Sequence, residues 1–144
     1  MIALYDKGVS WLTSKADIPL LLARLTIGGI FIQSGVGKLT HLADATQFFI
    51  ELGIPFPHFN ALFSSSTEVV AGFLILVGLF ARIATIPLII VMGVAIATAQ
   101  AVNVKSLIEF VGLQEWDYIV ILALLLISGP GKVSFDFFLR KKVR

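Results

Sequence analysis

From Val69 to Val102 the chain runs for 34 residues with a single charged side chain, that of Arg82. One continuous helix of that length would measure about 51 Å, whereas the hydrocarbon core of a bilayer is about 30 Å thick. Two membrane-crossing helices joined by a tight hairpin near Phe80–Ala84 fit the segment and leave Arg82 at the membrane surface. We therefore predict two spans here, at approximately 65–81 and 83–101.

Two further apolar stretches, at approximately 18–39 and 116–129, complete the pattern. The first has the length of about 20 residues that a span needs, while the last is short and would rely on interfacial Trp116 and Tyr118 or on local thinning of the bilayer. Hydrophobic residues make up 58% of the chain and charged residues 14%, against about 45–50% and 25% in soluble domains. The sequence predicts an all-α membrane protein, one domain over residues 1–144 forming a four-transmembrane-helix bundle. Three spans are the alternative.

Lysine and arginine residues are distributed unevenly between the loops. With the N-terminus inside, the opposite side holds only Lys38 and Lys105, whereas the cytoplasmic side holds eight cations: Lys7, Lys15, Arg82, Lys132, Arg140, Lys141, Lys142 and Arg144. This bias predicts that both termini of the multi-pass chain are cytoplasmic. The basic tail, 137–144, follows an apolar segment directly, so its expected partner is the lipid bilayer rather than nucleic acid.

Both loops on the predicted outer side carry helix-capping patterns. Asp44 is followed three residues later by Gln47, and Ser106 is followed by Glu109, which is the spacing of a capping box. We expect a short amphipathic helix at the interface in each loop, and a similar one at 2–12 on the cytoplasmic face.

Charged residues recur at helical spacing on two of the spans. The first span has Arg24, Gly28, Phe31, Gly35 and Lys38 at steps of four, three, four and three, and the second repeats these steps with Glu68, Gly72, Ile75, Leu79 and Arg82. Because a charge that faces lipid costs about 2.5 kcal/mol or more near the bilayer centre, we expect both faces to point into the bundle.

The antiparallel run of the spans predicts two polar layers. One layer would join Lys38 and Glu68 with Gln100 and Asp117, and the other would join Arg24 and Arg82 with Asp136 as the carboxylate. These groups are either a pocket for a polar headgroup or a quinone, or ion pairs that only fix the helix register, with Arg24 and Lys38 extending toward water.

Small residues indicate where helices approach one another. Gly28, Gly35 and Gly72 lie on the polar faces, and Gly93, Ala97 and Ala101 form a row with a spacing of four, which favours close packing in a membrane, inside the bundle or between two copies. The chain has no cysteine, and His41 and His58 both lie in one loop, so no metal site and no catalytic residues are predicted.

The polar faces also resemble a known family. Several motifs, in their order along the chain, are similar to those of the DoxX family of small bacterial membrane proteins. They are Arg24-x3-Gly28-x2-Phe31-x3-Gly35-x2-Lys38, then Gly53-Ile-Pro-Phe-Pro57, Glu68-x3-Gly72, Gly78 and Arg82, and the closing Gly129-Pro-Gly-x2-Ser134-x-Asp136. The resemblance implies a four-helix inner-membrane protein. The family takes its name from a thiosulfate:quinone oxidoreductase, and some relatives act with thiol-stress or metal-handling systems. Ala81 stands where the family commonly has threonine.

Three functions fit these observations. The first is a non-catalytic membrane subunit whose polar layers bind a lipid, a quinone or a partner protein. The second is the membrane subunit of a quinone-linked oxidoreductase, in which a redox or stress-response partner protein supplies the electrons. The third is a small transporter, for which the matched spacing of the first two spans resembles a repeat.

Overall fold

The computed structural model describes residues 15, 17–100 and 104–143, the last four of these by their backbone alone, and all regular elements among them are helices. The prediction of an all-α chain is therefore confirmed over this part of the sequence. The stretch at 2–12, Ala101 and Arg144 lie outside the described residues.

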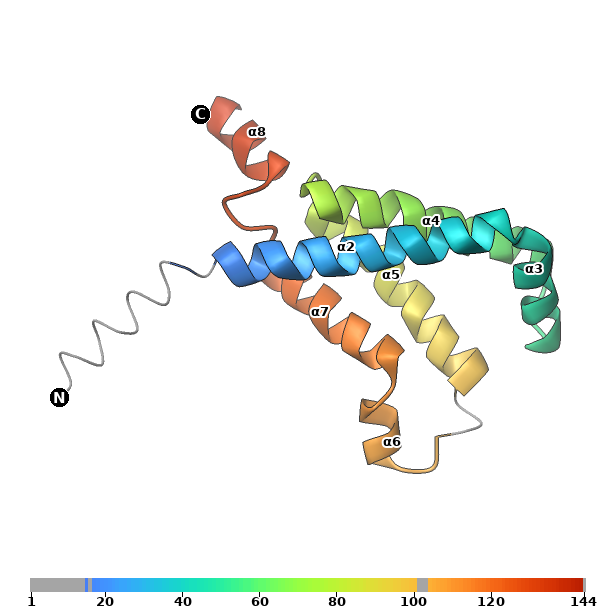
Figure 1. Ribbon diagram of the computed structural model, residues 1–144. Helices are drawn as coiled ribbons and strands as arrows, with labels where there is room; N and C mark the ends of the chain where they lie inside the picture. Colours follow the sequence, from blue (N-terminus) through green and yellow to red (C-terminus); the bar gives the residue numbers. More distant parts are fainter. Residues whose placement is uncertain (1–14, 16, 101–103, 144) are drawn as a thin grey trace.

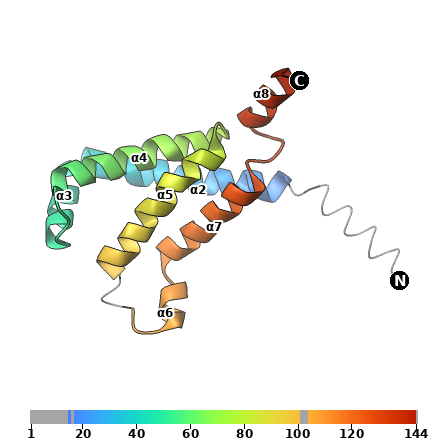
Figure 2. The ribbon, with the colours of Figure 1, turned by 180° about the vertical axis from the view of Figure 1, so that it is seen from behind.

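Helices α2 (Asp17–Thr40) and α4 (Pro57–Val77) lie side by side and antiparallel over most of their length (Figures 1 and 2). Glycines make this close approach possible. A Cβ atom added at Gly28 would lie 2.8 Å from the carbonyl oxygen of Gly72, and one added at Gly35 would lie 2.7 Å from that of Ser65. Gly28, Gly35 and Gly72 thus lie at a helix contact, as the sequence predicts.

Helix α4 begins eight residues before the predicted start of the second span. Pro57 occupies the first turn, where its missing N–H group removes no helical hydrogen bond. Ser64 and Ser65 do not break the helix, because their hydroxyls donate to its own backbone, to the Ala61 carbonyl at 3.4 Å and 2.6 Å. The polar residues therefore extend the helix rather than delimiting it.

The long apolar segment is divided at Gly78–Phe80. Gly78 ends α4 with φ 73° and Phe80 precedes α5 (Ala81–Ala95) with φ 48°, both in the left-handed region. Helix α5 continues into the π-helical turn η1 (Ile96–Gln100). The predicted hairpin is confirmed, slightly earlier than 80–84. As a result Leu79 and Arg82 do not continue the polar face of α4, which was wrongly predicted to include them.

Helix α7 (Gln114–Ser128) packs beside α5, and this pair crosses the α2–α4 pair at an angle (Figures 1 and 2). All four helices meet in one apolar core near the α4–α5 turn. Its buried residues recur every three or four positions and are Ile27, Phe31, Ala71, Ile75, Ala84, Leu88, Met92, Leu122 and Leu125. Toward Gln100 and Gln114, α5 and α7 diverge from α2 and α4, so the bundle is closed at one end only.

Within the described residues, three helices are long and apolar enough to cross a membrane: Asp17–Thr40, Pro57–Val77 and Ala81–Gln100. Helix α7 has 15 residues and would extend about 22 Å, short of a hydrocarbon core of about 30 Å. The membrane-protein architecture is thus supported by three spans.

Short helices occupy the connections. Helix α6 (Leu107–Val111) begins as predicted, with Ser106 Oγ accepting from the Glu109 N–H at 3.2 Å. Helix α3 (Leu42–Glu51) starts earlier than predicted: His41 is its N-cap, and Asp44 lies within the first turn. The prediction of Asp44 as the cap was wrong, because α3 follows α2 after a single residue. The chain ends in α8 (Phe135–Val143), which contains most of the basic tail.

The row of Gly93 and Ala97 lies on an exposed face of α5 and η1. A Cβ atom added at Gly93 would meet nothing within 4 Å. The expectation that this row packs inside the bundle was wrong. Helix α5 diverges from α2 and α4, so none of the described residues covers the row.

These contrasting glycines give a direct test. We expect Gly28→Ala to lower the free energy of unfolding by about 1–3 kcal/mol, because the new methyl group forces two backbones apart. Gly93→Ala is the matched control and should cause no loss, since open space surrounds that position. Thermal unfolding in mild detergent measures both, and equal melting temperatures for the two variants would contradict the α2–α4 contact.

Candidate functional site

Arg24 is the most buried cation at the end of the bundle that contains the α4–α5 turn, here called the hairpin end. Only 2% of the residue is exposed. Its Nε donates to the Ile75 carbonyl at 3.0 Å and its Nη2 to the Leu76 carbonyl at 2.9 Å. Its Nη1 donates to the carbonyls of Pro130 at 2.8 Å and Val133 at 2.6 Å. One guanidinium group thus joins α2, the last turn of α4 and the loop after α7.

The carbonyls at the end of α4 explain why Arg24 needs no carboxylate. The last turn of a helix leaves its carbonyl oxygens without helical partners and carries partial negative charge. The five N–H donors of an arginine can satisfy several such oxygens at once. Arg24 faces inward as expected. Asp136, the carboxylate expected at this level, lies at the same end but does not hydrogen-bond to Arg24.

Asp136 instead caps helix α5. Its carboxylate accepts hydrogen bonds from the backbone N–H groups of Phe80 at 2.8 Å and Ala81 at 3.3 Å, and its own N–H donates to the Gly78 carbonyl at 3.0 Å. Helix N-termini favour a negative charge. The loop after α7 therefore returns to the α4–α5 turn and fixes both sides of it.

Arg82 lies at the hairpin end, but its side chain is exposed and makes no hydrogen bond or ion pair with the described residues. It borders a cavity of about 540 Å³, lined also by Asp17, Phe80, Gly129, Lys132 and Asp136. A Cβ atom added at Gly129 would lie 2.9 Å from Arg82 Nη2, so the guanidinium lies against this glycine.

The two carboxylates of the cavity are already engaged. Asp17 accepts from the Lys132 N–H at 2.9 Å and lies 3.6 Å from Lys132 Nζ, while Asp136 caps α5. Arg82 was predicted to share a buried layer with Arg24 and Asp136. The structure places all three at one end, with Arg82 exposed beside the cavity rather than buried with Arg24.

At the other end of α2 and α4, the predicted Lys38–Glu68 pair is present. Lys38 Nζ lies 2.5 Å from Glu68 Oε1, and Ser34 Oγ donates to Glu68 Oε2 at 2.9 Å. Glu68 is 1% exposed, whereas the side chain of Lys38 is 40% exposed. Ser34 was missed by the sequence reasoning, although its position four residues before Lys38 places it on nearly the same helix face.

Gln100 and Asp117 do not join this pair. Gln100 Nε2 lies 3.4 Å from Glu115 Oε1, and Asp117 is exposed in the first turn of α7. The prediction of a four-residue layer assumed that all spans stay together along their length. Because α5 and α7 diverge from the other pair, the end of α5 and the start of α7 lie apart from the end of α2 (Figure 1).

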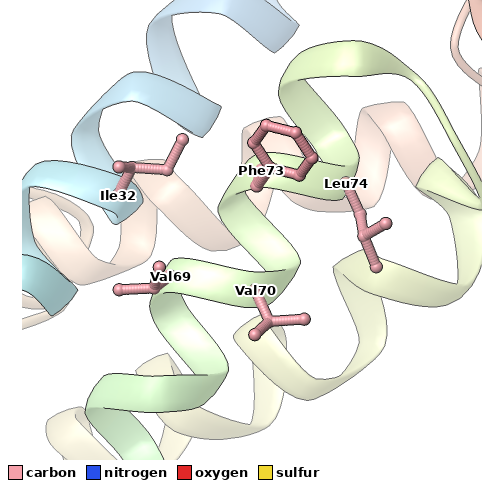
Figure 3. A pocket seen from close by; sticks show the side chains of 5 residues that line it. All are labelled: Ile32, Val69, Val70, Phe73 and Leu74. Atoms are coloured by element: carbon pink, nitrogen blue, oxygen red, sulfur yellow. The ribbon is translucent and has the colours of Figure 1, made fainter.

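A second hollow of about 310 Å³ lies between α2 and α4 on the outside of the bundle. Ile32, Val69, Val70, Phe73 and Leu74 line it, and the side chains are hydrocarbon only (Figure 3). The lining of this groove is apolar and offers no group for chemistry.

No buried side-chain nitrogen or oxygen lacks a hydrogen-bond partner in the described part of the chain. Nor does any group of three His, Cys, Asp or Glu residues there lie close enough to hold a metal ion. The polar groups inside the bundle therefore satisfy one another, and the groups open to a ligand are at its margins.

Comparison with known proteins agrees with these features. The family model described as DoxX matches residues 19–101. "Inner membrane protein YphA" of Escherichia coli (strain K12) is 32% identical over 128 residues, covering 81% of this chain and 87% of that protein. "Uncharacterized membrane protein Rv3486" of Mycobacterium tuberculosis is 31% identical, covering 92% and 90%. "Putative oxidoreductase CatD" of Bacillus subtilis (strain 168) is 31% identical, covering 87% and 90%. No solved structure matches the chain.

The Lys38–Glu68 pair can be tested by removing one partner. We expect Lys38→Met to destabilise the protein by about 1–3 kcal/mol, because Glu68 would remain buried with only the Ser34 hydroxyl as a partner. The double variant Lys38→Met/Glu68→Met should regain most of the lost stability, because no buried charge remains. Thermal unfolding in detergent reports both changes.

Asp117→Asn is the control and should change stability by less than about 0.5 kcal/mol, as exposed substitutions do. A Lys38→Met variant that is as stable as the unchanged protein would show that Glu68 does not depend on Lys38.

Proposed function

Because the chain belongs to the DoxX family of membrane proteins, we propose that it is a non-catalytic membrane subunit that binds the polar head of a membrane-soluble molecule at the cavity beside Arg82. The ligand would be a lipid or a quinone. One observation supports this proposal above the others: a guanidinium group without a partner among the described residues borders a cavity whose carboxylates are already engaged.

The chemistry of the cavity suits a molecule with a polar head and an apolar tail. An arginine presents a planar set of N–H donors that matches phosphate, carboxylate or carbonyl oxygens. Exposed apolar side chains surround the same opening: Phe80 is 58% exposed, Ile83 is 66% exposed and Phe137 is 42% exposed. The head would contact Arg82 while the tail remains among these groups and the surrounding lipid.

The proposal includes the four-span arrangement with both termini in the cytoplasm. Helix α7 would be the fourth span, with Trp116 and Tyr118 at its interfacial end and the bilayer thinned around it. Helices α3 and α6 would lie at the outer interface. This orientation puts Arg82, Lys132 and the basic tail at the cytoplasmic leaflet, whose anionic lipids attract cations.

A second candidate is the membrane subunit of a quinone-linked oxidoreductase. The name of one relative, "Putative oxidoreductase CatD", favours it, and a quinone carbonyl is one of the oxygens that Arg82 could bind. In this case a redox or stress-response partner protein would supply the electrons, since the polar groups described above include no redox-active side chain.

Ligand binding at the cavity is tested with Arg82→Gln. The protein is purified in mild detergent, and the phospholipid and quinone that remain bound are quantified by mass spectrometry. We expect Arg82→Gln to reduce the retained ligand by about tenfold, because a charge-assisted hydrogen bond contributes about 1.5–3 kcal/mol. Lys105→Gln removes an exposed cation from another loop and should retain the ligand in full.

Equal retention by both variants would contradict binding at Arg82. Retained quinone, together with a co-purifying protein that carries a redox cofactor, would favour the oxidoreductase subunit over the lipid-binding one.

The orientation is tested by single cysteines, because the natural chain has none. We expect Lys105→Cys to react with a membrane-impermeant maleimide in intact spheroplasts, and Lys132→Cys to react only after the membrane is opened. The reverse pattern would place the Arg82 cavity at the outer leaflet, and labelling of both before opening would show that α7 does not cross the membrane.

A further inference from the structure

The outward face of α2 carries polar side chains where a membrane helix would ordinarily face lipid. Thr26 and Gln33 are exposed, and neither makes a hydrogen bond with the described residues. They lie seven residues apart, opposite the buried face of Arg24, Phe31 and Gly35. The carboxamide of Gln33 is thus directed away from the bundle.

The depth of Gln33 makes this exposure costly. Gln33 lies five residues before Lys38. It is therefore about 7.5 Å farther than Lys38 from the Thr40 end of α2. At this depth water is scarce, and a carboxamide without a hydrogen-bond partner is unfavourable in hydrocarbon. A second helix that presents a donor and an acceptor at the same depth would remove the penalty.

The residues around Gln33 permit such an approach. Gly29 and Gly37 lie four positions before and after it, and a Cβ atom added at either would meet nothing within 4 Å. Their missing side chains let another backbone come close enough for a glutamine to bond across the contact. The same face carries no charge from Leu25 to Thr40, so it repels no copy of itself.

We infer that this face of α2, defined by Thr26, Gly29, Gln33 and Gly37, is the contact surface for a second copy of the chain. All copies enter the membrane in one orientation, so a two-fold axis along the membrane normal places Gln33 at the same depth in both. A carboxamide is both donor and acceptor, and two of them satisfy each other. This contact is independent of ligand binding at Arg82.

Disulfide cross-linking tests the contact, since a single introduced cysteine has no competitor in this chain. Thr40 continues the same face at the end of α2, and Phe63 is exposed on α4 at a similar depth, given that Gly35 lies opposite Ser65. In oxidised native membranes we expect Thr40→Cys to form a covalent dimer and Phe63→Cys to remain largely monomeric.

The role of the carboxamide is tested in the Thr40→Cys background. Gln33→Leu should weaken dimerisation about threefold to thirtyfold, the range given by interhelical hydrogen bonds. Gly37→Leu should reduce cross-linking as well, by separating the backbones. Thermal unfolding of each variant in detergent separates a lost contact from a lost fold.

Three outcomes would overturn the inference. They are equal cross-linking at Thr40→Cys and Phe63→Cys, undiminished cross-linking in well-folded Gln33→Leu, and a cross-linked product that contains a different protein. The Arg82→Gln ligand measurement is unaffected by any of them.

Discussion

Arg24 holds the hairpin end of this protein together through backbone carbonyls rather than through an opposite charge. A membrane offers no water to the last carbonyls of a helix that ends inside the protein. Helix α4 ends at Val77, and Arg24 bonds to the carbonyls of Ile75 and Leu76 and to two carbonyls of the loop after α7. Arg24 thus holds that loop against α4, together with the bond from the Lys132 N–H to Asp17, and the same loop leads to Asp136, which caps α5.

The two ends of the bundle differ in how many elements their polar side chains join. At the hairpin end, Arg24 and Asp136 join all the elements that meet there. At the other end, Lys38 and Glu68 join only α2 to α4, and α5 and α7 diverge (Figure 2). The hairpin end therefore has the more fixed geometry for binding a ligand, and the proposed Arg82 cavity lies at this end.

The sequence predicted those features that depend on helical spacing. The buried face of α2, the Lys38–Glu68 pair and a break between the second and third spans, predicted slightly later than it occurs, all follow from period and length. It did not predict the partners of Arg24, because backbone carbonyls leave no trace in a pattern of side chains. It also misplaced Gln100, Asp117 and Gly93, since the angle between the two helix pairs is set by packing across the whole core. Ser64–Ser66 obscured the start of α4 because a serine hydroxyl can be satisfied within its own helix.

Arg24 and Arg82 lie at the same end of the protein, and the fold uses them differently. Arg24 lies against the carboxyl end of α4, where partial negative charge favours a cation. Arg82 lies in the first turn of α5, where the partial charge is positive and where Asp136 accepts from the N–H groups of Phe80 and Ala81. The charge of Arg82 therefore opposes the dipole of its own helix, and an anionic or carbonyl-bearing head in the adjacent cavity would offset this opposition. Local electrostatics and the adjacent cavity thus both favour a ligand at Arg82.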